Sequence, residues 1–170
     1  MTQLTEATER ELTVTWSDPA ALAEAGMRMS GLDYLRAIGA GELPMPPIAR
    51  LMGFEGIDVE DGRNVFSCTP GEQHFNPIGM VHGGLAMTLL DSAMGCAVHT
   101  TLPAGTGYTS LEAKVNFTRP ITADTGRILA EGTVVHRGSR VATAEGRLTA
   151  AETGKLLAHA STTCLVMAPG

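Results

Sequence analysis

The chain has 170 residues, 44% hydrophobic and 18% charged, which suits one compact domain with a buried core and excludes a disordered or fibrous protein. Its 12 Lys and Arg against 18 Asp and Glu give a formal charge of −6, which argues against a nucleic-acid-binding protein. The acidic start without an apolar core predicts no secretory signal, and the most apolar stretch, residues 83–98, is too short to span a bilayer.

Three cysteines, Cys68, Cys96 and Cys164, lie far apart in the sequence and form no CxxC pair. This spacing indicates neither a metal site nor a redox motif, and it favours a reducing, cytoplasmic location. Each cysteine sits in an apolar run, so we interpret all three as small buried residues and not as nucleophiles.

Residues 1–44 are expected to form a partly flexible N-terminal extension with short helices, ahead of a main domain at residues 45–170. Asp18 followed by Pro19 predicts the start of a helix, with Asp18 as N-cap. A second short helix is expected at about residues 32–38. The prolines at positions 44, 46 and 47 then predict an extended turn.

The main domain predicts one long helix and about six strands. The helix is apolar on nearly every side, so it must be wrapped by other elements, and we expect an α+β fold with a curved antiparallel sheet around it. Only turn residues separate the last four strands, which predicts short hairpins between them. The strands are expected at residues 54–59, 64–68, 109–118, 126–136, 140–150 and 156–167.

The segment that leads into the helix ends in His82-Gly83-Gly84. Two glycines at a helix start let a ligand approach the first-turn N–H groups, which have no partners inside the helix. Those N–H groups and the positive end of the helix dipole would stabilise an oxyanion. The alternative interpretation is that the glycines only permit a tight turn into the helix.

Asp91 lies in the middle of the helix, on a predicted stripe with Gly84, Met87, Met94, Gly95 and Val98. A carboxylate there is unfavourable unless it has a partner or faces a wet cleft, so it is either functional or held by a structural contact such as an inter-subunit hydrogen bond or a salt bridge. Eight residues separate it from Gly83, about 12 Å along the helix axis, so one carbonyl cannot contact both in one chain. If both serve one site, the protein is a two-fold homodimer with two composite sites.

Asn76, His82-Gly83-Gly84 and Asp91, at gaps of six and nine residues, resemble the hotdog-fold acyl-CoA thioesterases and in particular their phenylacetate-degradation (PaaI-like) branch. The resemblance continues through residues 109–120, 138–140 and 152–158, and it covers about residues 45–167. It implies a long helix wrapped by an antiparallel sheet, dimers whose sheets join, frequent pairing of dimers into homotetramers, and no metal or other cofactor.

The resemblance also implies roles for single residues. Asp91 matches the catalytic carboxylate, which acts as nucleophile or as general base on water, and Gly83 matches the amide that polarises the thioester carbonyl. Asn76 matches a residue that orients water or the carbonyl, His82 matches the adjacent site residue, and Ser110 is similar to a residue that positions water in some members.

Two features concern the neighbourhood of this site. Another branch of the family carries a Thr four positions after the carboxylate, and this chain has Gly95 there. The phosphates of coenzyme A also call for cationic contacts and backbone N–H groups, although the arginines at strand ends are equally interpreted as solvated surface residues. The candidate substrate-binding residues are Gly84, Arg119, Arg137, Gly138, Ser139 and Arg140.

The predicted function is hydrolysis of an acyl-CoA, with aromatic and medium-chain acyl groups as candidates, to a free carboxylic acid and coenzyme A. The sequence contains no GxSxG motif, which argues against a serine hydrolase. Two alternatives stay open. One is a hotdog dehydratase acting on 3-hydroxyacyl thioesters, which residues 74–77 faintly resemble, and the other is a non-catalytic acyl-CoA-binding protein.

Overall fold

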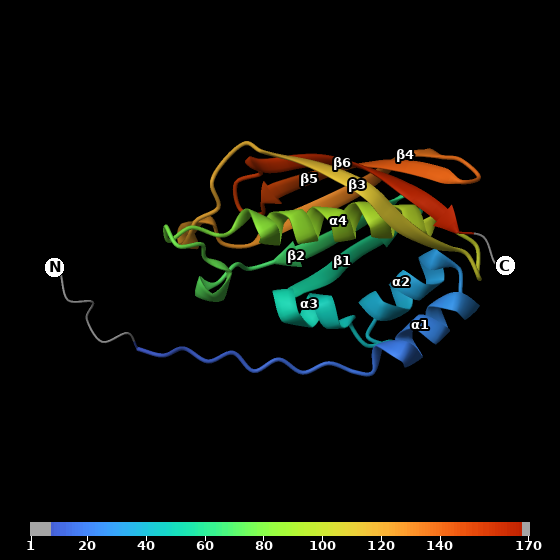
Figure 1. The fold of residues 1–170 in the computed structure, drawn as a ribbon, viewed down its shortest axis with the longest axis horizontal. Coiled ribbons are helices and arrows are strands. Elements are labelled where there is room, and N and C mark those ends of the chain that lie inside the picture. Colours follow the sequence, from blue (N-terminus) through green and yellow to red (C-terminus); the bar gives the residue numbers. More distant parts are fainter. Residues whose placement is uncertain (1–7, 168–170) are drawn as a thin grey trace.

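A six-stranded antiparallel sheet curves around one long helix, α4 (Gly83–Thr100), in the computed structural model, which describes residues 8–167 (Figure 1). This confirms the predicted α+β architecture, the hotdog fold. The strand order across the sheet is β1-β2-β4-β5-β6-β3. The strands are β1 (Phe54–Glu60), β2 (Arg63–Cys68), β3 (Gly107–Phe117), β4 (Ile128–Arg137), β5 (Val141–Ala150) and β6 (Leu156–Met167).

The core lies between α4 and the concave side of the sheet. Leu89, Leu90 and Ala93 of α4 are fully buried, because the helix turns its apolar side chains toward inward-facing positions of the strands. Glycine in the central strands brings the sheet unusually close, since a Cβ at Gly132 would lie 2.3 Å from the carbonyl oxygen of Ala93. The middle of the helix therefore lies directly against the sheet.

The connection between β3 and β4 differs from the prediction. Hairpins do join β1 to β2, β4 to β5 and β5 to β6, but β3 pairs with β6 at the far edge of the sheet. The predicted short hairpin from β3 to β4 is therefore wrong. Turn residues show where a chain reverses and do not show which strand it then pairs with.

Three helices precede the sheet: α1 (Pro19–Arg28), α2 (Gly31–Gly39) and α3 (Pro47–Met52). The Ala20 N–H donates a 2.9 Å hydrogen bond to Asp18 Oδ1, which confirms the predicted N-cap. The extended turn predicted from the prolines at positions 44, 46 and 47 leads into α3, a helix that was not predicted. Pro47 at its first position and Gly53, at a φ of 66° after its last, are both helix-boundary signals in the sequence. The first seven residues of the predicted extension lie outside the described residues.

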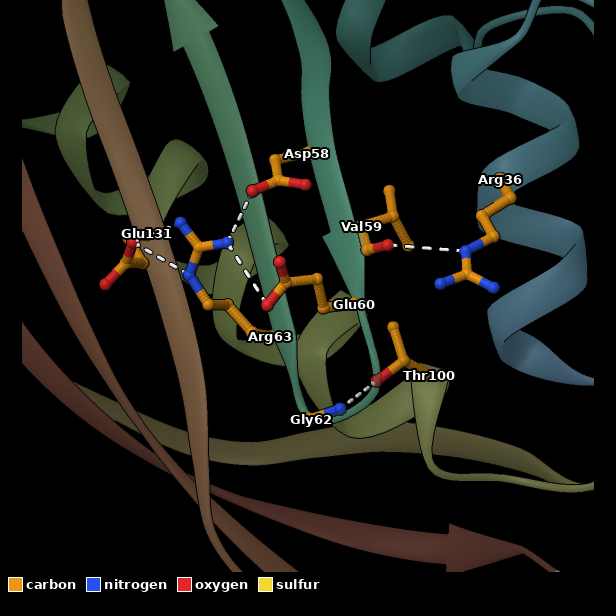
Figure 2. Close-up of polar contacts among 8 residues, drawn as sticks. All are labelled: Arg36, Asp58, Val59, Glu60, Gly62, Arg63, Thr100 and Glu131. Atoms are coloured by element: carbon orange, nitrogen blue, oxygen red, sulfur yellow. Dashed lines mark hydrogen bonds and ion pairs between the residues drawn. The ribbon is translucent and has the colours of Figure 1, made fainter.

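Polar contacts anchor the C-terminal end of α4 to the hairpin β1–β2 (Figure 2). The Gly62 N–H in the hairpin turn donates to Thr100 Oγ1 at 2.8 Å, and Arg36 of α2 donates to the Val59 carbonyl at 3.4 Å. Next to this turn, Arg63 forms ion pairs with Glu131 at 2.8 Å and with Asp58 at 2.5 Å. The Gly62–Thr100 bond joins the C-terminal end of α4 to the hairpin, while the other contacts hold β1, β2, β4 and α2 together around it. None of the helices at residues 8–167 has the length and apolarity to cross a membrane.

Candidate active site

The first turn of α4 presents one unused amide. His82 is the N-cap, and its Nδ1 accepts a 2.9 Å hydrogen bond from the Gly84 N–H. Within residues 8–167 no hydrogen bond reaches the Gly83 N–H. Because this N–H lies at the positive end of an 18-residue helix, it is suited to bind a carbonyl oxygen or an oxyanion. Of the two predicted glycine amides, only that of Gly83 is available.

The ring of Phe117 lies against this amide. A Cβ at Gly83 would be 3.0 Å from Phe117 Cζ, so the ring occupies the space that any larger residue at position 83 would need. Phe117 is the last residue of β3 and is half exposed. No role was predicted for Phe117. The strand pattern gives the face of β3 on which its ring lies, but it does not give the residue of α4 that the ring contacts.

Asn76 shapes the loop that delivers His82. Its side-chain oxygen accepts hydrogen bonds from the N–H groups of Ile78 and Met80, each at 3.1 Å, and its own N–H donates to the Met80 carbonyl at 2.7 Å. The oxygen is thus committed to the loop, and only the amide NH₂ remains for a substrate or water.

His74 belongs to the same loop and links it to the site. Its carbonyl accepts a 2.8 Å hydrogen bond from the His82 N–H, and its Nδ1 accepts one of 3.0 Å from the Gly71 N–H. Burial lowers the pKa of His74, so the neutral ring that this acceptor role requires is favoured.

Asp91 is exposed on α4 and has one hydrogen-bond partner among the described residues. Ser110 Oγ of β3 donates to Asp91 Oδ1 at 2.8 Å. The register of β3 against β6 shifts between Ser110 and Glu112, and Thr162 Oγ1 donates to the Glu112 carbonyl at 2.6 Å within this irregularity. A bulge re-aims a side chain next to it, here at the point where Ser110 meets α4.

The helix face that carries Asp91 is open in its first half and covered in its second. Met87, one turn earlier, is 46% exposed, but Met94 and Val98 are fully buried inside the chain. Gly95 is covered by the Tyr108 ring, since a Cβ there would lie 2.8 Å from Tyr108 Cε2. Helical spacing alone did not show that β3 covers the second half of this face, so the open part of the helix is confined to its first half.

The residues predicted to contact the phosphates of coenzyme A lie at two separate places in one chain. Arg119 lies near the Gly83 end of α4, where its Nη1 donates to the Leu156 carbonyl at 2.8 Å. Arg137, Ser139 and Arg140 lie at the β4–β5 turn, beside the opposite end of α4. The Gly138 N–H donates to the Val141 carbonyl at 2.8 Å, which leaves it unavailable to a phosphate.

No metal ligands and no activated thiol accompany the site in the part of the chain that the structure describes. There, no group of three or more His, Cys, Asp or Glu residues gathers closely enough to hold a metal ion. Burial raises the pKa of Cys68 to about 11 and that of Cys96 to about 12, so both thiols stay protonated at neutral pH. The chemistry available here is that of an amide dipole and a carboxylate.

Comparisons with known proteins relate the chain to thioesterases. Residues 78–157 match the model of the thioesterase superfamily, a segment that contains Gly83, Asp91 and Ser110. A candidate esterase from Saccharolobus solfataricus is 33% identical over 113 residues, which cover 66% of this chain and 78% of that protein. Mouse acyl-coenzyme A thioesterase 13 is 35% identical over 89 residues, covering 52% of this chain and 61% of the mouse protein.

A solved structure of a similar protein has the same fold. A thioesterase from Ralstonia eutropha, described as a phenylacetic acid degradation-related protein, superposes with a TM-score of 0.70 at 29% identity, covering 78% of this chain and 98% of its own. Across the three similar curated proteins, the matched part spans between 61% and 78% of their length. The chain belongs to the thioesterase superfamily, as a hotdog-fold thioester hydrolase similar to the phenylacetate-degradation (PaaI-like) branch.

Proposed function

We propose that the protein hydrolyses acyl-CoA thioesters to a free carboxylic acid and coenzyme A. The observation that carries the proposal is the exposed carboxylate of Asp91, bonded to Ser110 and placed eight residues after the unused Gly83 amide on one helix. The similar mouse protein is named as an acyl-coenzyme A thioesterase, which supports coenzyme A as the carrier. Aromatic and medium-chain acyl groups are the candidate substrates.

The proposed site is composite and lies between two copies of the chain. Gly83 and Asp91 are about 12 Å apart along α4, too far for one carbonyl to touch both. In a two-fold dimer with antiparallel helices, the amide of one subunit faces the acid of the other. The edge of β3 supports this arrangement, because its backbone groups on that side have no partner strand within residues 8–167 and suit pairing with the same strand of a second copy. Pairing of two such dimers into a homotetramer is part of the proposal.

In the proposed mechanism the Gly83 N–H donates to the thioester carbonyl oxygen. With Asp91 of the other subunit as general base, water adds to the carbonyl carbon while the carboxylate takes its proton. The negative charge on the oxygen is stabilised by the amide and the helix dipole. Collapse breaks the carbon–sulfur bond, and the departing thiolate takes up the proton. Direct attack by Asp91, through an anhydride that water then opens, is the second form of the same proposal.

The remaining residues are assigned supporting roles. Ser110 holds one oxygen of Asp91 and leaves the other for water, while Asn76 and His82 shape the loop at the carbonyl. Arg119 of one subunit and Arg137, Ser139 and Arg140 of the other are proposed to contact the phosphates of coenzyme A. The N–H groups of Gly84 and Gly138 are already bonded within the chain, so these two glycines are left out of the proposed contacts. We also propose residues 45–170 as the thioesterase domain, residues 1–44 as its extension, and a cytoplasmic location.

A thiol-trapping assay tests the function. The protein is incubated with phenylacetyl-CoA, hydroxybenzoyl-CoA and medium-chain acyl-CoAs, and release of free thiol is followed over time. Release by the wild type that is lost in Asp91→Asn is the expected result. Undiminished release in Asp91→Asn contradicts the proposed mechanism. Conversion of a 3-hydroxyacyl thioester to its unsaturated product without thiol release indicates the dehydratase, and binding without turnover indicates the acyl-CoA-binding protein.

A further inference from the structure

Three aromatic rings from three different elements stack in a line beside the C-terminal half of α4. The ring of Tyr34, from α2, lies 5.6 Å from that of His99, from α4, and His99 lies 5.3 Å from Tyr108, from β3. Figure 1 shows α2 beneath this end of α4. Tilted rings at these separations attract each other beyond the area they bury. The line therefore connects the N-terminal helices to the edge strand across the central helix.

The line of three rings is closely packed, because glycines lie where the rings and α2 contact the neighbouring elements. A Cβ at Gly31 of α2 would lie 1.8 Å from the His99 carbonyl oxygen. The Gly31 N–H also donates to the Leu102 carbonyl at 3.0 Å, just beyond α4. On the other side of Tyr34, a Cβ at Gly26 of α1 would lie 3.1 Å from its ring. A shift of α1 or α2 is therefore transmitted to His99.

The same line ends two residues from the candidate catalytic contact. Tyr108 and Ser110 lie on one face of β3, and they meet α4 at Gly95 and Asp91, one helical turn apart. The Tyr108 ring fills the space between β3 and α4, since a Cβ at Gly95 would lie 2.8 Å from its Cε2 atom. The ring therefore helps to set the distance between β3 and α4 two residues before Ser110.

We propose that Tyr34 and Tyr108 are positioning residues, which act through His99 to hold β3 at the distance from α4 that the Ser110–Asp91 hydrogen bond requires. This rests on the proposed function of Asp91. It gives the helices at residues 19–39, which lie outside the segment matched by the family model, a role in catalysis without contact to substrate.

The test compares Tyr34→Ala with Tyr34→Phe in the full chain, using the acyl-CoA that the wild type hydrolyses fastest. We expect Tyr34→Ala to lower kcat about tenfold with KM within about twofold, because a small misplacement of a catalytic group costs up to about 100-fold. Tyr34→Phe keeps the ring and is expected to restore kcat to within about twofold of the wild type. Tyr108→Phe, which keeps its ring as well, is expected to lose less than Tyr34→Ala.

Leu35→Ala is the matched control, since Leu35 is a buried residue of the same helix that is not part of the ring line. Its thermal unfolding is measured beside that of Tyr34→Ala. A kcat loss in Leu35→Ala equal to that in Tyr34→Ala, at the same loss of stability, overturns the proposal, as does an unchanged kcat in Tyr34→Ala. Asp91→Asn is measured in parallel. If it retains activity the proposed function fails, whereas its inactivity together with an unaffected Tyr34→Ala overturns only the inference.

Discussion

The hydroxyl of Ser110 donates a 2.8 Å hydrogen bond to Asp91 Oδ1, joining the edge strand β3 to the middle of α4. This bond holds one oxygen of an exposed carboxylate in a fixed place and leaves Oδ2 without a partner among the described residues. A carboxylate oriented in this way can take a proton from water in a single geometry.

Replacement of Asp91 by asparagine removes the base while keeping the size of the side chain. We expect kcat for thioester hydrolysis to fall by about 100-fold or more, since general-base catalysis contributes about 10² to 10⁴. The side chain is exposed, so the free energy of unfolding should change by no more than about 0.5 kcal/mol. Thiol release and urea unfolding are the measurements. A variant that loses its activity only because it unfolds would contradict the catalytic assignment.

Ser110→Ala tests the orientation of the acid. A hydrogen bond to a charged group contributes about 1.5 to 3 kcal/mol, so its loss should lower kcat by roughly tenfold or more. Thr109→Ala is the control, because successive side chains of a strand point to opposite faces and Thr109 is exposed. Steady-state kinetics of both variants measure kcat. An equal loss of kcat in the two variants would show that any change in β3 lowers the activity, and it would contradict a specific role of the Ser110 hydroxyl.

Gly83→Ala tests the packing at the amide. The new Cβ would lie 3.0 Å from Phe117 Cζ, so the ring must move or the start of α4 must shift. We expect the single variant to lose both stability and activity, and Gly83→Ala combined with Phe117→Ala to show a coupling of about 0.5 to 3 kcal/mol. A double-mutant cycle of unfolding free energies measures it. Strictly additive changes in the free energy of unfolding would show that the Phe117 ring does not restrict the size of the residue at position 83.

Stability should depend on pH through two imidazoles. Burial lowers the pKa of His74 and of His99 below the ordinary value, so the unfolded chain binds protons at a higher pH than the folded chain does. Their contribution is therefore present above about pH 6.5 and is lost as the pH falls through the folded pKa values. Urea unfolding at about pH 7.5 and about pH 5.5 should show this. His99→Phe keeps a ring between Tyr34 and Tyr108 and should weaken the dependence, and an unchanged dependence would exclude His99 as a source.

The thiols should react slowly in the folded protein. Burial raises the pKa of Cys68 to about 11 and that of Cys96 to about 12, and it raises the pKa of Cys164 as well. Because the thiolate is the reactive form, alkylation of Cys68 at about pH 8 should be roughly 100-fold slower than in the unfolded chain, and alkylation of Cys96 slower still. Mass spectrometry of timed iodoacetamide reactions gives the rate at each position. Rapid labelling of any one cysteine would reopen the question of a thiol nucleophile.

Much of the local structure follows from the sequence because its causes are local. Alternating apolar residues and turn residues predicted every strand to within two residues, and the apolar run after Gly83 predicted α4. Asp18 before Pro19 predicted the cap of α1. Helix α3 was not predicted, although Pro47 at its start and Gly53 after its end are local boundary signals of the same kind.

By itself, the sequence determined which chemical groups this protein possesses: an amide at a helix start, an acid two turns later, and strands enough to enclose the helix. Tertiary structure alone decided which of those groups are open and what they touch. Pairing of β3 with β6 placed Ser110 on Asp91, covered Gly95 with Tyr108 and set Phe117 against Gly83. The reason is that spacing along a chain fixes the face on which a side chain lies, while the partner of that face is chosen by packing between segments distant in sequence.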